Sequence, residues 1–162
     1  VLRYWDGSAW TAHVYSPAAP AEADRPAGLA RLSVPQRVSA VSMLIVIVAA
    51  FLPWVSIFGI SALGIEGDGA ITLLLALVGS VVLVVSSGVI GSARTPGRAS
   101  RITLLVLAVL VALISVADMN GAAAIGLYLT MFAGVAWVVG AVWELVVTSS
   151  STSAAGPAQT SR

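Results

Sequence analysis

Four long apolar runs lie between Arg37 and Val147, and arginines occur only in alternate segments around them. Three of the four runs have at least the roughly 20 residues that a helix needs to cross a hydrocarbon core about 30 Å thick, and the third is slightly shorter. Apolar residues make up 59% of the chain and charged residues 9%, which leaves too little polar surface to cover a soluble globule. The sequence therefore predicts an all-α membrane protein, a four-helix transmembrane bundle whose spans are residues 38–59, 70–91, 102–117 and 122–147.

The arginines predict the orientation of these spans. They precede the first run and fill the segment between the second and third runs: Arg25, Arg31, Arg37, Arg94, Arg98 and Arg101. The other two connections carry acidic residues instead, Glu66 and Asp68 in one and Asp118 in the other. Because basic loops stay on the cytoplasmic side, we expect a multi-pass protein of the cell (cytoplasmic) membrane with both termini in the cytoplasm.

Composition divides the chain into four parts. Residues 1–15 form an aromatic head, 16–36 a linker rich in proline and alanine, and 37–147 the membrane domain. Residues 148–162 are mostly serine, threonine, alanine and glycine, so we expect a disordered tail. Because the chain starts with valine and not methionine, we also expect it to be truncated upstream.

The head has the pattern of a β-hairpin. Leu2–Trp5 and Trp10–Val14 are aromatic and β-branched runs, and Asp6-Gly7 between them favours a tight turn. Cross-strand stacking of the two tryptophans would supply most of its core. Since so small a hairpin is only marginally stable alone, we expect it to contact a partner, with these candidate residues: Trp5, Asp6, Trp10 and His13. For His13 we favour a hydrogen-bonded framework role over metal binding.

The head also resembles a known family. The pattern Tyr4-Trp5-Asp6-Gly7, then Trp10-Thr11 and His13, resembles the second half of domain of unknown function 2510, a short tryptophan-rich module of actinobacterial membrane proteins. The resemblance covers Leu2 to Val14 and implies that the first half of the module lies upstream. Phe51 to Val55 is similar, more loosely, to the four-span membrane proteins that often follow this module. The resemblance implies no activity for particular residues.

Three acidic positions are candidates for binding or pairing. Glu66 and Asp68, flanked by glycines, form a weak cation candidate, because calcium prefers six to eight oxygen ligands and a solvated turn explains them more simply. Glu144 is expected near the cytoplasmic end of the last span, where it would pair with Arg98 or Arg101.

Pro53 and Trp54 fall near the outer end of the first predicted span. Proline is expected to kink that helix, and the tryptophan to anchor it at the membrane interface. The alternative is that the kink acts as a gating hinge.

Chemistry-bearing motifs are missing from the sequence. It has no cysteine, a single histidine, no HExxH and no glycine-rich phosphate loop, so we expect neither an enzyme nor a cofactor. A net charge of +1 argues against nucleic acid. We expect the lipid bilayer and a protein partner or second copy, bound through the head or membrane domain. The favoured function is a membrane accessory or scaffold protein with a cytoplasmic interaction module; the alternatives are a small transporter or channel and an envelope or lipid sensor.

Overall fold

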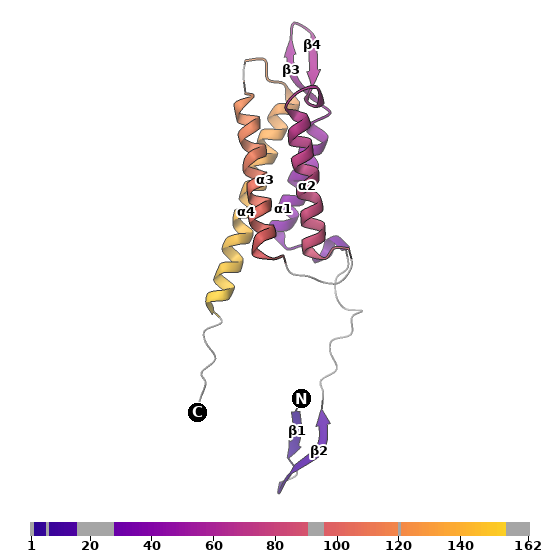
Figure 1. The fold of residues 1–162 in the computed structure, drawn as a ribbon, viewed down its shortest axis with the longest axis vertical. Helices are drawn as coiled ribbons and strands as arrows, with labels where there is room; N and C mark the ends of the chain where they lie inside the picture. The colour runs from indigo at the N-terminus through magenta and orange to yellow at the C-terminus, as the bar shows by residue number, and fades with distance from the viewer. Residues whose placement is uncertain (1, 6, 16–27, 91–95, 120, 155–162) are drawn as a thin grey trace.

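Four helices and two small β-hairpins make up the part of the chain that the computed structural model describes, residues 2–5, 7–15, 28–90, 96–119 and 121–154 (Figure 1). The helices are α1 (Val34–Ala49), α2 (Gly69–Ser87), α3 (Arg98–Ala117) and α4 (Ile125–Ala154). The strands are β1 (Leu2–Trp5), β2 (Trp10–Tyr15), β3 (Pro53–Ile57) and β4 (Ile60–Leu63). Two short 3-10 turns are η2 (Gly28–Arg31) and η3 (Gly64–Glu66). The predicted fold class, mainly helical with a small antiparallel hairpin near the N-terminus, is confirmed.

Helices α1 to α4 lie side by side and form what we call the helical domain (Figure 1). Trp137 of α4 is the largest fully buried side chain in its core. Gly79 of α2 makes room for it, since a Cβ at Gly79 would lie 2.6 Å from the Cη2 and Cζ2 atoms of the indole. The other buried core residues are mostly aliphatic: Met43, Val46, Ala76, Leu83, Leu104, Ala108, Val111 and Ala133.

Buried hydroxyl groups in this core hydrogen-bond within their own helices. Ser39 donates to the carbonyl of Pro35 at 3.1 Å, and Ser115 donates to that of Val111 at 2.7 Å. Thr130 donates to the carbonyl of Gly126 in the same way, at 2.9 Å. A hydroxyl that bonds back one turn needs no water, so these groups are compatible with an apolar surrounding.

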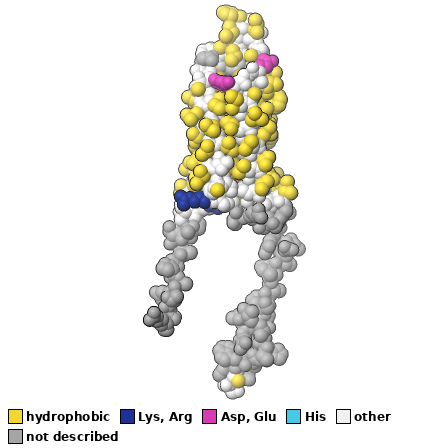
Figure 2. Space-filling view, viewed as in Figure 1, with side chains coloured by type: hydrophobic (Ala, Val, Ile, Leu, Met, Phe, Trp, Pro, Cys, Tyr) yellow, Lys and Arg dark blue, Asp and Glu magenta, His cyan; other side chains and the backbone are white. Residues whose placement is uncertain are grey.

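The lateral surface of the helical domain is apolar, and its charges lie at the two ends (Figure 2). Large side chains such as Leu44, Leu74 and Phe132 are exposed on α1, α2 and α4. We call the end that carries Arg31, Arg37, Arg98 and Arg101 the arginine end, and the end that carries Glu66, Asp68 and Asp118 the acidic end. Helices α2, α3 and α4 are each long and apolar enough to cross a membrane, whereas α1 has 16 residues.

The first helix ends ten residues earlier than predicted, and a second hairpin replaces its outer part. The sequence predicts one span over residues 38–59, but α1 stops at Ala49 and β3 begins at Pro53. Proline has no amide hydrogen to donate and disfavours the helical conformation of the residue before it. The expectations that Pro53 kinks a continuous helix, or serves as a hinge within it, are therefore wrong.

The new hairpin has a two-residue turn and is tied to the far end of the chain. Ile57 pairs with Ile60, and Phe58 and Gly59 between them have φ angles of 49° and 82°. Two consecutive positive φ angles are typical of a type I′ turn, whose twist suits antiparallel strands. The other edge of β3 bonds to the segment before α4, where the Ser56 amide donates to the carbonyl of Ala122 at 2.9 Å.

The last helix begins and ends later than the predicted 122–147. Residues 122–124 are used in pairing with β3, so α4 starts at Ile125. At the other end, residues 148–154 were expected in the disordered tail but continue α4. Here the Thr148 hydroxyl bonds the carbonyl of Glu144 at 2.8 Å, satisfying an acceptor within the helix. Residues 155–162 of the predicted tail lie outside the described residues.

Candidate functional site

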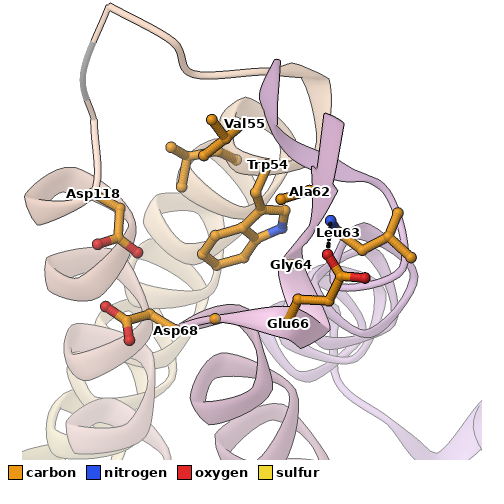
Figure 3. A pocket seen from close by; sticks show the side chains of 10 residues that line it. Trp54, Val55, Ala62, Leu63, Gly64, Glu66, Asp68 and Asp118 are labelled. Carbon is orange, nitrogen blue, oxygen red and sulfur yellow. Dashed lines mark hydrogen bonds between the residues drawn. The ribbon is translucent and has the colours of Figure 1, made fainter. Parts of the chain in front are cut away.

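A cavity of about 330 Å³ opens at the acidic end, beside the β3–β4 hairpin (Figure 3). Residues of both strands line it, together with η3 and the residues that follow it. Asp118, which directly follows α3, lies on its other side. The cavity exists because the chain leaves α1 as a hairpin instead of continuing as a helix.

Trp54 forms one wall of this cavity and is buried. Its indole Nε1 donates a hydrogen bond to the carbonyl of Ala49 at 3.0 Å, at the end of α1. Gly64 and Gly126 pack against the ring so closely that a Cβ at either position would overlap it. Trp54 is therefore a packed cap on α1, and the expectation that it is an interfacial anchor is wrong.

Two carboxyl groups face each other at the cavity, those of Asp68 and Asp118 (Figure 3). Partial burial, the negative charge of Asp68 and a hydrogen bond with Asp68 raise the pKa of the Asp118 carboxyl above its ordinary value of 3.8. Two nearby carboxylates repel each other, and a proton held between them relieves that repulsion. The Asp118 carboxyl is therefore protonated more readily than that of an isolated aspartate.

Glu66 and Asp68, the predicted cation candidate, point to different partners. Glu66 Oε2 accepts a hydrogen bond from the Leu63 amide at 3.1 Å, while Asp68 faces Asp118 (Figure 3). Within the described part of the chain, no group of three or more His, Cys, Asp or Glu residues is arranged to hold a metal ion. The structure therefore brings Asp68 together with Asp118 and gives Glu66 a local structural contact.

Glu144 lies at the arginine end and is only 5% exposed. Its Oε1 accepts a 2.7 Å hydrogen bond from Nε2 of Gln36 on α1. Arg101 Nε on α3 lies 3.7 Å from the same oxygen, an ion pair without hydrogen-bond geometry. Of the two predicted partners, the structure thus brings Arg101 to Glu144, and the cluster joins α1, α3 and α4.

Gln36 was not singled out from the sequence, although its position carries a signal. Its side chain also accepts a hydrogen bond from the Ser33 amide at 3.0 Å, just before α1. Serine followed three residues later by glutamine marks a helix N-terminus. What the pattern cannot reveal is that the amide of Gln36 then reaches α4.

The head forms the predicted antiparallel hairpin. Leu2 pairs with Tyr15, and Trp5 is the backbone partner of Trp10. Asp6 and the side chains of Trp5, Trp10 and His13 lie outside the described residues. Of the head candidates, the backbone register therefore brings Trp5 and Trp10 together.

Three helices that can cross a membrane, with charges confined to the two ends, define a membrane protein. Residues 1–23 match the family model described as Protein of unknown function (DUF2510). The chain thus carries a DUF2510 segment at its start, and this match leaves the helical domain uncovered. No curated protein and no solved structure matches the chain.

Proposed function

We propose that this protein is a membrane scaffold, a four-helix transmembrane bundle that holds its DUF2510 head at the cytoplasmic face of the cell membrane. The observation that carries the proposal is the closed interior of the helical domain. Trp137 and its aliphatic neighbours fill most of the space between the helices, the two larger cavities lie at the ends, and a small pocket of about 70 Å³ lies between α1 and α2 beside Met43 and Leu83. A helical domain whose described core is packed in this way is better suited to holding a partner than to passing a solute.

The polar groups of the described core support the same conclusion. A transport path through a membrane needs polar or ionisable side chains that face a water-filled space. Here the hydroxyls of Ser39, Ser115 and Thr130 are bonded to backbone carbonyls of their own helices. The buried carboxylate of Glu144 accepts a hydrogen bond from Gln36, and both residues lie at the arginine end of the helical domain and not halfway between its ends.

In this proposal α1 is the fourth crossing segment. Its 16 residues rise about 24 Å, which is shorter than a hydrocarbon core of about 30 Å. The apolar residues Ala50 to Trp54 extend it at the acidic end, and local thinning of the bilayer accommodates the remaining mismatch. The arginine end then faces the cytoplasm, together with both termini.

Accessibility labelling tests the orientation. The chain has no cysteine, so Gly67→Cys, Ala99→Cys and Ser150→Cys each introduce one unique thiol. An impermeant thiol reagent applied to intact cells should label only the cysteine at position 67, and all three after the membrane is opened. Labelling of positions 99 or 150 in intact cells would reverse the assignment.

Crosslinking in native membranes tests the scaffold role. We expect a crosslinked partner with the unaltered chain and its loss with Trp10→Ala. Trp143→Ala is the matched control, because it makes the same change at an exposed position of α4. Recovery of monomers alone, or an equal loss with both variants, would count against the proposal. A flux of ions or small solutes into liposomes containing the purified protein would favour transport instead.

A further inference from the structure

A second large cavity, a groove of about 790 Å³, lies at the arginine end between the start of α3 and the last turns of α4. Arg98 and Arg101 line it from α3, and Thr148 and Ser149 line it from α4. Apolar side chains such as Ile102 and Val146 complete the walls. Cationic, hydroxyl and aliphatic groups therefore meet in one opening.

The charge in the groove is positive. Arg98 is exposed, and none of the described carboxylates forms an ion pair with it. Arg101 has Glu144 beside it, but that carboxylate is buried, already accepts a hydrogen bond from Gln36, and lies 3.7 Å from Arg101 Nε. The groove therefore has two positively charged guanidinium groups and one buried carboxylate, and this excess of positive charge attracts an anion.

The apolar walls restrict what kind of anion fits. Ile102 and Val146 are about half exposed and belong to the lateral surface that faces lipid in a membrane protein. A free phosphate ion would use the arginines and leave these walls in water. A phospholipid uses both, with its phosphate on the arginines and its acyl chain along the aliphatic side chains.

We propose that this groove binds the headgroup of an anionic phospholipid. Its phosphate accepts hydrogen bonds from Arg98 and Arg101, and its acyl chain lies against Ile102 and Val146. Basic pockets between membrane-spanning helices have the chemistry that holds such headgroups. The bound lipid would join the ends of α3 and α4, as the ion pair between Arg101 and Glu144 also does.

Native mass spectrometry of the full chain in detergent tests the site. The probes are phosphatidylglycerol and phosphatidylcholine with identical acyl chains. We expect one phosphatidylglycerol to stay bound and Arg98→Gln to weaken that binding about fivefold, since an arginine near a membrane surface contributes about that factor. Phosphatidylcholine should bind more weakly and respond little to the substitution.

Arg37→Gln is the matched control. Arg37 is also an exposed arginine of the arginine end, but its guanidinium bonds the carbonyls of Leu32 and Ala30, outside the groove. Equal weakening by Arg37→Gln and Arg98→Gln would show diffuse attraction and overturn the site. So would equal binding of both lipids, or displacement of phosphatidylglycerol by inorganic phosphate at the same concentration.

Discussion

The contact between Gly79 and Trp137 gives the sharpest test of the helical domain. In Gly79→Ala, the added Cβ would lie 2.6 Å from Cη2 and Cζ2 of Trp137 and 3.5 Å from Cε of Met43. Because Trp137 is fully buried, neither the ring nor the helix can move away freely. Overpacking of this kind costs about 1–3 kcal/mol, and replacing glycine by alanine within a helix returns about 0.5–1 kcal/mol.

These two terms leave a net loss of up to about 2.5 kcal/mol, and their mid-range values predict that Gly79→Ala lowers the free energy of unfolding by about 1 kcal/mol, a factor of roughly 5 in the ratio of folded to unfolded protein. Helical circular dichroism during unfolding in mixed micelles measures the change. Gly121→Ala is the matched control, because a Cβ there meets nothing within 4 Å. It should change stability by less than about 0.5 kcal/mol.

A double-mutant cycle separates this contact from general helix effects. Trp137→Phe removes the two indole atoms that the Cβ would meet, so in that background Gly79→Ala should stabilise by the helix gain of about 0.5–1 kcal/mol. The coupling energy should then equal the overpacking cost, about 1–3 kcal/mol, whereas residues without contact add to within about 0.5 kcal/mol. Simple additivity of the two substitutions would refute the packing described for Trp137.

Three further predictions each concern a single residue. Gln36→Ala should lower stability by about 1.5–3 kcal/mol, because the buried Glu144 carboxylate loses its 2.7 Å hydrogen bond. Thermal unfolding in detergent measures this change, and an unchanged unfolding midpoint would contradict the hydrogen bond. Asp118 has a raised pKa in the folded protein, so its protonated form favours folding, and stability is lost as the pH rises from 3.8 through the raised value. Asp118→Asn should flatten that part of the profile of melting temperature against pH, and an unaltered profile would argue against the Asp68 pair. Phe58→Asn should stabilise the β3–β4 hairpin by about 1 kcal/mol, because Phe58 is fully exposed and has a φ of 49°, which asparagine tolerates better. Slower amide hydrogen exchange in the hairpin would show this stabilisation, and faster exchange would indicate that the Phe58 ring is packed.

Two of the helices and the N-terminal hairpin could be predicted from the sequence. The apolar runs predict α2 and α3 to within a few residues, and the aromatic and β-branched runs on either side of Asp6-Gly7 predict β1 and β2. In each case the signal is local, because one segment supplies its own backbone hydrogen bonds or pairs with an immediate neighbour.

The outer end of α1 was missed because hydrophobicity does not distinguish a helix from a buried or paired strand. A local signal existed, since Pro53 is followed by aromatic and β-branched residues and then Gly59. The cavity at the acidic end was missed with it. Asp68 and Asp118 meet only through the packing of α2 on α3, and no spacing in the sequence reports that contact.

Pairing of β3 with the segment before α4 has a consequence for the order of assembly. The Ala124 amide donates to the carbonyl of Trp54 at 2.8 Å, and Ser56 bonds Ala122. These bonds join a segment that precedes α2 to a segment that follows α3, so during synthesis β3 is made long before its partner. Residues 54–56 must remain without these bonds until residues 122–124 are made, and the acidic-end cavity is therefore completed only after α2 and α3.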